Sequence, residues 1–97
     1  MRYSITFAPE AQDDFRSLSA YDRAAVRDAI NHHLPHEPMR ESKSRIKRLR
    51  EMMKPQYRIR VGDFRVFYDV SGLEVEVLAI VDKMRAAEWL EKWGIRS

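Results

Sequence analysis

Alternating hydrophobic and polar positions give the clearest structural signal of the chain, in residues 56–70. Two runs rich in β-branched and aromatic residues, 57–61 and 64–70, flank the dipeptide Gly62-Asp63. A leading glycine suits a two-residue type II′ turn, so the pattern predicts a β-hairpin with Arg60 opposite Arg65. Because side chains alternate between the faces of a strand, one face is apolar, made by Tyr57, Ile59, Val61, Phe64, Val66 and Tyr68. The other face carries Arg58, Arg60, Arg65 and Phe67.

The first third of the chain predicts one strand followed by two helices. Residues 2–7 alternate as a strand does, and Pro9 suits the first turn of a short amphipathic helix. Ser19, with Asp22 three residues later, predicts the cap of a second helix, which Pro35 ends. Two helices separated by so short a break imply an antiparallel helical hairpin.

The remaining elements are predicted with less regular patterns. Residues 35–44 lose periodicity and indicate a loop, whereas Ile46, Leu49 and Met53 have the spacing of a helical turn. Residues 73–81 become apolar on both faces, which is typical of a central strand. Asp82 is expected to cap a final helix that ends at Gly94.

We therefore predict one α+β domain over residues 1–97, in the order β-α-α-β-β-β-α. It has a mainly antiparallel four-stranded sheet, with the N-terminal helical hairpin on one face and a C-terminal helix. The expected core consists of Tyr3, Ile5, Phe7, Phe15, Leu18, Val26, Ile30, Ile59, Val61, Val66, Val75 and Val77.

Composition narrows the class of protein. The chain has 97 residues and no cysteine, which excludes disulfides, thiolate chemistry and cysteine-based zinc sites. The N-terminus meets Pro9 too soon for a signal peptide, and no apolar run approaches the roughly 20 residues that span a bilayer. We expect a cytoplasmic protein without membrane contact.

Charge is unevenly distributed along the chain. The net charge is +3, but residues 40–60 hold nine lysines and arginines against Glu41 and Glu51, a local charge of +7. A basic block that continues onto one strand face favours an acidic partner such as nucleic acid or an acidic protein segment. A merely solvated charged face is the alternative.

Other kinds of chemistry have weaker support. His32, His33 and His36 cluster beside Glu37, but neighbouring helical residues point about 100° apart, so we expect no metal site. The chain has three glycines, all at predicted turns or caps, and no phosphate-binding glycine loop or serine nucleophile motif. No cofactor is expected.

The segment Tyr57-Arg58-Ile59-Arg60-Val61-Gly62-Asp63-Phe64-Arg65-Val66-Phe67-Tyr68 resembles the Y-R-x-R-x-G-x-[YF]-R-x-x-Y signature of RelE/ParE superfamily toxins. These are the toxin halves of type II toxin–antitoxin modules. The resemblance extends to the chain length, the helical hairpin, the Lys47-Arg48-Leu49 segment before the signature, and an Arg-x-x-Glu from Arg85 to Glu88.

The resemblance implies a function and a set of residues. In the ribonuclease branch, the toxin cleaves mRNA in the ribosomal decoding site. The implied catalytic residues here are Arg58, Arg60, Arg65, Lys83 and Arg85. The basic block adds Lys43, Arg45, Lys47, Arg48, Arg50 and Lys54 as expected nucleic-acid contacts, and Phe67 or Trp89 is expected to stack on a base. Arginine stays protonated, so Lys54 and Lys83 are the candidates for proton transfer.

Two departures from the family pattern keep other functions open. Leu90 occupies the position where the pattern has a C-terminal aromatic residue, and no tyrosine follows Tyr68. A ParE-like inhibitor of DNA gyrase, or a toxin fold that only binds its partner, therefore remains an alternative. In each case the resemblance implies a small, often acidic antitoxin that covers the basic surface.

Overall fold

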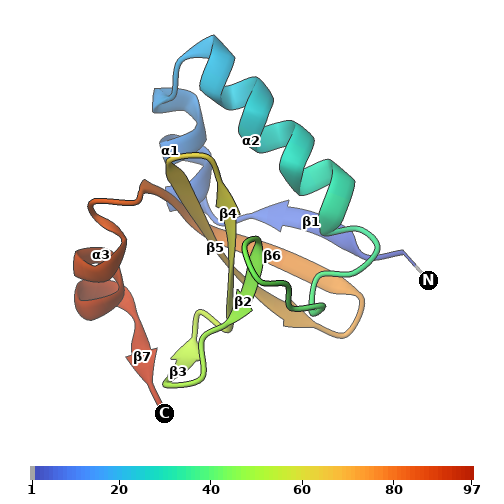
Figure 1. Cartoon of the computed structure of the whole chain (residues 1–97), viewed down its shortest axis with the longest axis vertical. Helices are drawn as coiled ribbons and strands as arrows, with labels where there is room; N and C mark the ends of the chain where they lie inside the picture. Colours follow the sequence, from blue (N-terminus) through green and yellow to red (C-terminus); the bar gives the residue numbers. More distant parts are fainter. Residues whose placement is uncertain (1) are drawn as a thin grey trace.

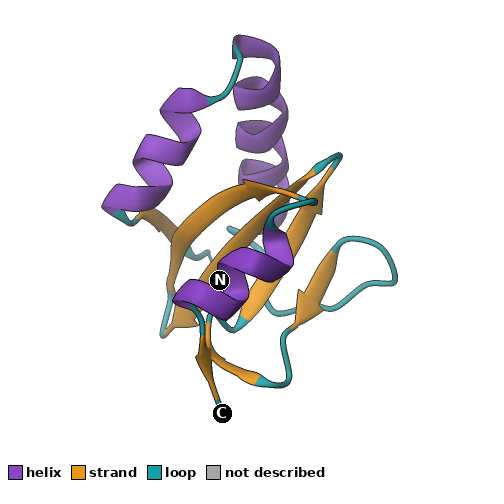
Figure 2. Ribbon diagram, turned by 90° about the vertical axis from the view of Figure 1, so that its left-hand side faces the viewer, coloured by secondary structure: helices purple, strands orange, loops and turns teal. Residues whose placement is uncertain are grey.

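The computed structural model describes residues 2–97 and has a mixed sheet with helices on both faces (Figures 1 and 2). The elements are β1 Ser4–Phe7, α1 Pro9–Ser17, α2 Ala20–His33, β2 Ile46–Arg48, β3 Met52–Lys54, β4 Tyr57–Val61, β5 Phe64–Ser71, β6 Glu74–Asp82, α3 Ala86–Trp93 and β7 Ile95–Arg96. Five strands pair in the order β1-β6-β5-β4-β2, and β3 pairs with β7. β1 runs parallel to β6, and the other pairs are antiparallel.

The hairpin forms with the predicted register. Tyr57 pairs with Tyr68, Ile59 with Val66 and Arg60 with Arg65. Gly62 has a φ of +55°, while no residue other than glycine has a positive φ within residues 2–97. A positive φ at the first turn position alone is the requirement of a type II′ turn, so the glycine sets the register.

The helical hairpin packs on the predicted apolar face of the sheet. Ile59, Val66, Val75 and Val77 have no solvent exposure. Every residue of the predicted core either belongs to the buried cluster or packs against it. Ser19 caps α2 as expected, because its Oγ accepts a hydrogen bond from the Asp22 amide at 3.1 Å.

Residues 46–48 and 52–54 form two short strands, so the predicted helical turn is wrong, and β2 makes the main sheet five-stranded rather than four-stranded. Ile46 pairs with Ile59 and is buried. Beyond β2, the Arg60 amide donates to the Arg45 carbonyl at 2.9 Å. A helical turn would have left these β4 backbone groups unpaired, and that cost favours the strand despite the helical spacing of the apolar residues.

A bulge in β6 changes which face its side chains occupy. Phe67 pairs with Ala79 but Tyr68 pairs with Val77, which leaves Leu78 as the extra residue. Ile80 therefore joins the core beside Val77, although strict alternation would place the two on opposite faces.

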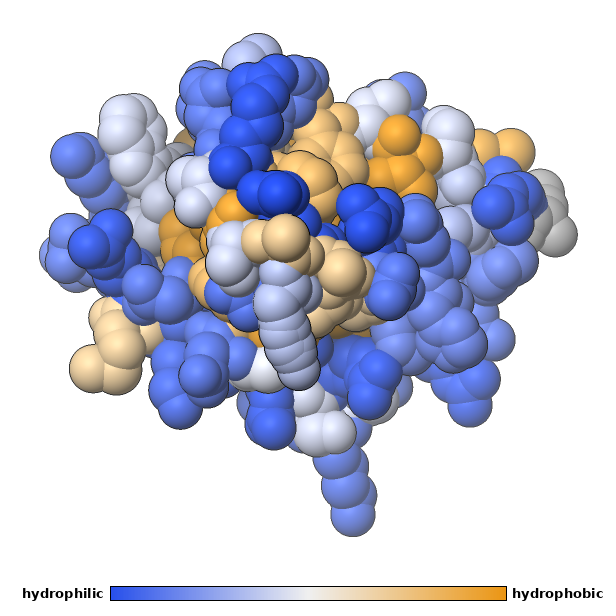
Figure 3. All heavy atoms as spheres, turned by 90° about the horizontal axis from the view of Figure 1, so that it is seen from above, coloured by the Kyte–Doolittle hydropathy of each residue, from blue (hydrophilic) through white to orange (hydrophobic). Residues whose placement is uncertain are grey.

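α1 completes the edge of β6 beyond the end of β1. The Ala8 amide donates to the Val77 carbonyl at 2.9 Å, and Asp14 Oδ2 accepts from the Ile80 amide at 2.9 Å. Between α1 and α2 lies a cavity of about 460 Å³, lined in part by Phe7, Phe15 and Ile30. Seen from above, the surface of the molecule has groups of hydrophobic residues bordered by hydrophilic residues (Figure 3).

The C-terminal helix lies on the other face of the sheet (Figure 2). Asp82 Oδ1 accepts from the Met84 and Arg85 amides at 3.0 and 3.1 Å, so Asp82 closes the turn before α3 and Arg85 is the residue at the cap position. Gly94 ends the helix as predicted. No helix within residues 2–97 has the length and apolar character needed to cross a membrane.

Candidate nucleic-acid interface

Four basic side chains share the sheet face that points away from the helical hairpin. Arg58 and Arg60 lie on β4, Arg65 lies opposite Arg60 on β5, and Lys47 lies opposite Arg58 on β2. We call these four residues the arginine face. Within residues 2–97, none of the four forms an ion pair with a carboxylate.

The electrostatics of Arg58 reflect this crowding. Burial lowers the pKa of the Arg58 guanidinium, and the charges of Arg65 and Arg60 lower it further. The group remains protonated because arginine does not release its proton in proteins. Three cations whose charges repel one another therefore offer a site where an anion gains attraction from all of them.

Backbone carbonyls hold two of the three arginines. Arg65 Nη1 donates to the Gly62 and Phe64 carbonyls at 3.1 and 3.0 Å, and Arg58 Nη1 donates to the Arg45 carbonyl at 3.5 Å. Arg60 is exposed, and its guanidinium has no protein partner in the described part of the chain. Arg65 is thus preorganised, whereas Arg60 is free to contact a ligand.

Lys83 and Arg85 lie beyond β6, near the turn end of the hairpin. The Lys83 amide donates to the Asp63 carbonyl at 2.7 Å, and Lys83 Nζ lies 3.3 Å from Asp63 Oδ1. Arg85 is exposed, with its Nε 3.9 Å from Asp82 Oδ2. Lys83 therefore contacts the hairpin turn directly, whereas the side chain of Arg85 lies beside Asp82 at the end of β6. The sequence predicts only a turn role for Asp63, because nothing in its pattern indicates the ion pair with Lys83.

Phe67 and Trp89 stack on each other rather than standing open to a base. Their ring centroids are 4.9 Å apart, with the planes 8° from parallel. Phe67 is 1% exposed, so a nucleobase cannot reach it in this arrangement. Trp89 is half-buried and lines a cavity of about 630 Å³ together with Lys54 and Trp93.

Most of the basic block before the hairpin points elsewhere. Arg50 pairs with Glu41 at 3.1 Å, and Lys54 Nζ lies 3.9 Å from Asp69. Lys43 is exposed in the loop.

The contacts of the Arg48 side chain lie within the protein. Its Nη1 donates to the Leu49 and Gln56 carbonyls at 3.0 and 2.8 Å, and its guanidinium carbon lies 5.4 Å from the centre of the Tyr57 ring. Arg45 turns toward α2. Of the six basic residues from 43 to 54, Lys47 is the one on the arginine face.

Tyr68 lies in the core and faces the helical hairpin. Its hydroxyl donates to the Pro38 carbonyl at 2.6 Å, and burial raises its pKa well above the ordinary range. Tyr68 therefore takes no part in the arginine face. Within residues 2–97, no group of three or more histidines, aspartates and glutamates is arranged to hold a metal ion.

A small α+β domain with a basic hairpin face is the architecture of a known class of toxins. The family model of the ParE toxin of the type II toxin–antitoxin system parDE matches residues 5–87. The chain belongs to this family, within the RelE/ParE superfamily. Among curated proteins, no sequence matches the chain.

Three solved structures illustrate the fold that this chain shares. The RelBE2 toxin–antitoxin complex of Mycobacterium tuberculosis matches at 25% identity and a TM-score of 0.72, over 84% of this chain and 99% of the other. The RelE–RelB complex of Pyrococcus horikoshii matches at 24% and 0.71, over 89% and 100%. The YoeB dimer of Staphylococcus aureus matches at 17% and 0.63, over 81% and 94%.

Proposed function

We propose that this toxin is a ribosome-dependent mRNA endoribonuclease that arrests translation in the cytoplasm. The observation that carries the proposal is the arginine face, where three guanidinium groups converge without a carboxylate partner in the described residues. Arginine clusters of this kind match the oxygens of a phosphodiester. The similar fold of the RelE complexes supports the same assignment.

The proposed reaction is cleavage by an internal nucleophile. The ribose 2′-oxygen attacks the adjacent phosphorus, the bond from phosphorus to the 5′-oxygen breaks, and the products end in a 2′,3′-cyclic phosphate and a 5′-hydroxyl. The proton of the 2′-hydroxyl leaves to a base, and the 5′-oxygen gains a proton. Fixed cations stabilise the charge that develops on the phosphorane oxygens, with no further reorganisation needed at that moment.

The residues divide this work by their positions. Arg60 and Arg65, opposed across the hairpin, bind the two sides of the phosphate, and Arg58 strengthens the field from a less hydrated position. Lys83, near the hairpin turn, is assigned the proton transfer because arginine does not release a proton. Arg85 extends the cationic surface along the same strand of RNA.

We expect the activity to depend on the ribosome because the arginine face has few groups that could orient a free RNA. Its cations contact phosphate, which positions a nucleic acid without reading its sequence. Phe67 is covered, so Trp89 is the aromatic group left near the face for stacking on a base. Free RNA would be poorly oriented by so few groups, and the decoding site supplies an mRNA held in one geometry.

Inhibition of DNA gyrase is the second candidate. The family model that matches the chain describes a ParE toxin, and Leu90 replaces the C-terminal aromatic residue of the ribonuclease pattern. A gyrase inhibitor needs no catalytic residues, so the fold and the charge suit it as well.

We further propose a small acidic antitoxin as the partner of this chain. The RelBE2 and RelE–RelB structures are complexes of toxin with antitoxin. An acidic segment laid over the arginine face would neutralise it by charge pairing and cover the proposed active site.

Expression of the toxin without an antitoxin separates the two functions. If the proposal is right, translation stops first, and primer extension finds cuts in translated messages at the decoding position. The same message with its start codon removed stays intact. Uncut messages together with stalled replication and gyrase-linked DNA breaks would instead establish the ParE-like function.

A further inference from the structure

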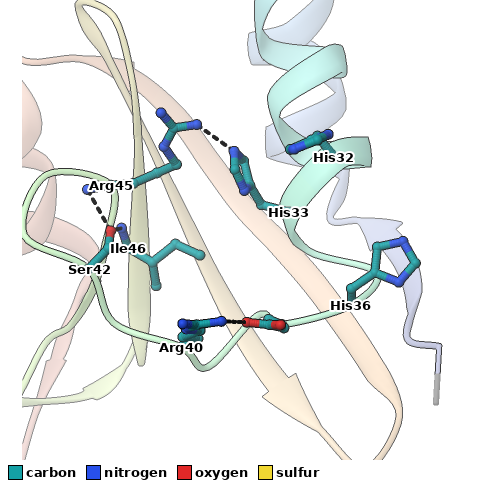
Figure 4. Close-up of a pocket in the computed structure, with 8 residues that line it drawn as sticks. His32, His33, His36, Arg40, Ser42, Arg45 and Ile46 are labelled. Carbon is teal, nitrogen blue, oxygen red and sulfur yellow. Dashed lines mark hydrogen bonds and ion pairs between the residues drawn. The ribbon is translucent and has the colours of Figure 1, made fainter.

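A basic cavity lies on the other side of the sheet edge from the arginine face, where α2 ends. It has a volume of about 350 Å³, and its lining includes His32 and His33 from α2, His36 and Arg40 from the following loop, and Arg45 just before β2 (Figure 4). Glu37 is the one acidic residue among the described residues that line it, and Arg40 holds it in an ion pair of 2.8 Å.

Two basic side chains contact each other inside this cavity. Figure 4 shows the Arg45 guanidinium directed at the His33 ring, where Nη1 donates to Nε2. Arginine has only donors, so His33 accepts with Nε2 and is neutral, with its proton on Nδ1. Burial lowers the pKa of His33, and the charges of Arg45 and His32 lower it further. The free protein therefore leaves Arg45 without a counter-charge.

We propose that this cavity binds a phosphate group, held by Arg45 and by His33, which becomes protonated as the phosphate binds. An oxyanion between the two side chains would replace a weak contact between bases with charge-assisted hydrogen bonds to both. The cavity stands apart from the arginine face, and its ligand binding does not depend on the proposed reaction.

The charge of the lining changes with pH in the range where histidine titrates. With the His33 imidazole neutral, Arg45 supplies one uncompensated positive charge, and protonation of His33 adds a second. The C-terminal end of α2 favours protonated imidazole, although the same helix end weakly opposes an anion. Phosphate binding is therefore coupled to proton uptake and weakens as pH rises through the histidine pKa.

The backbone of Arg45 connects this cavity to the arginine face. Its carbonyl accepts from the Arg60 amide at 2.9 Å and from Arg58 Nη1 at 3.5 Å, while its side chain points into the cavity. The phosphate has two sources: free phosphate, or the backbone of a nucleic acid that crosses the edge at β2.

The test is a titration of the whole protein with inorganic phosphate and with a short oligoribonucleotide, followed by NMR of the histidine ring nitrogens. We expect the His33 ring signals to shift to those of the protonated form as either probe binds. Arg45→Gln should weaken binding about tenfold. The matched control is Arg16→Gln, which removes an exposed arginine of α1 outside the cavity and should leave binding unchanged.

The pH dependence uses the oligoribonucleotide, whose diester charge stays constant between about pH 5.5 and about pH 8. Wild-type affinity should fall across this range, and His33→Gln, which keeps an acceptor for Arg45, should flatten that fall. Binding of the free ion alone identifies free phosphate as the ligand, and tighter binding of the oligoribonucleotide identifies a nucleic-acid backbone.

The proposal is overturned if His33 does not shift with either probe, or if Arg16→Gln weakens binding as much as Arg45→Gln does. It also fails if an acidic peptide competes as strongly as phosphate. The titration of the wild-type protein decides the matter even if Arg45→Gln does not fold.

Discussion

At the opposed pair Arg60 and Arg65, the proposed function and the stability of the sheet make opposite demands. Like charges placed opposite each other weaken a sheet. Arg65 offsets part of this cost, because its guanidinium donates to the Gly62 and Phe64 carbonyls at the turn. Arg60 has no such compensation in the described residues, so its position is unfavourable until an anion binds.

This difference predicts opposite effects of two similar substitutions. Arg60→Ala should leave the free energy of unfolding unchanged or raise it by a few tenths of a kcal/mol, because repulsion is removed. Arg65→Ala should lower it by about 0.5–1 kcal/mol, because hydrogen bonds at the turn are lost. Thermal or urea unfolding of both variants, in low and high salt, measures the effect. Equal losses for the two would show that Arg60 has a structural role that its exposed position does not explain.

Among the elements, α1 does more than cover the core. It supplies Asp14 to the Ile80 amide, at a place where β6 has run past its partner β1. Burial raises the pKa of Asp14, the hydrogen bond from Ile80 acts against this, and the charges of Asp13 and Glu10 add to the rise. The Asp14 carboxylate thus accepts a hydrogen bond from an otherwise unpaired amide of β6, but it loses part of its own hydration.

Two substitutions at Asp14 separate the hydrogen bond from the charge. Asp14→Ala should lower the free energy of unfolding by about 1–2 kcal/mol, because the Ile80 amide loses its acceptor. Asp14→Asn keeps an acceptor and should cost much less. A carboxyl with a raised pKa in the folded state makes stability fall as pH rises above its ordinary value of about 4. Asp14→Asn should therefore gain stability relative to wild type between about pH 3 and pH 7. An unchanged difference across that range would contradict this explanation.

The short strand β2 separates two neighbouring basic residues by face. Lys47 lies on the arginine face opposite Arg58, whereas Arg48 bonds the Leu49 and Gln56 carbonyls. Lys47→Gln should weaken RNA or ribosome binding and reduce the salt slope by about one unit, with stability unchanged. Arg48→Gln should instead lower the melting temperature and leave the salt slope intact. A reduced slope for Arg48→Gln would mean that its guanidinium leaves these carbonyls to bind phosphate.

The elements that sequence predicts well are those in which local preference and burial agree. The hairpin register follows from Gly62 together with strict alternation, and the helical hairpin follows from Pro9 and Ser19. β2 is missed because its apolar spacing is helical, and its strand geometry is set by the open edge of β4. Strand alternation places Phe67 on the same side of the sheet as the arginine face, but only the docking of α3 shows that Trp89 covers it.

For the whole molecule, the contacts that each charged side chain makes decide the binding surface more than the number of charged residues along the chain does. Residues 40–60 carry a local charge of +7, but several of these cations have partners within the chain. Arg50 pairs with Glu41, Arg48 donates to backbone carbonyls, and Arg45 contacts His33. The cations of the arginine face have no carboxylate partner among the described residues. The sequence predicts an acidic partner, but which cations remain available to such a partner depends on tertiary contacts.

The central claim is that the arginine face stabilises charge during RNA cleavage, and it is tested most directly by single-turnover cleavage of mRNA on saturating ribosomes. With Arg60→Ala, the rate should fall by about 100-fold or more, because the charge developing on the phosphate loses a cation. The control Arg16→Ala, which alters an exposed arginine on α1, should cleave at the wild-type rate. If Arg60→Ala cleaves normally once ribosomes are in excess, the arginine serves adhesion alone and the claim is wrong.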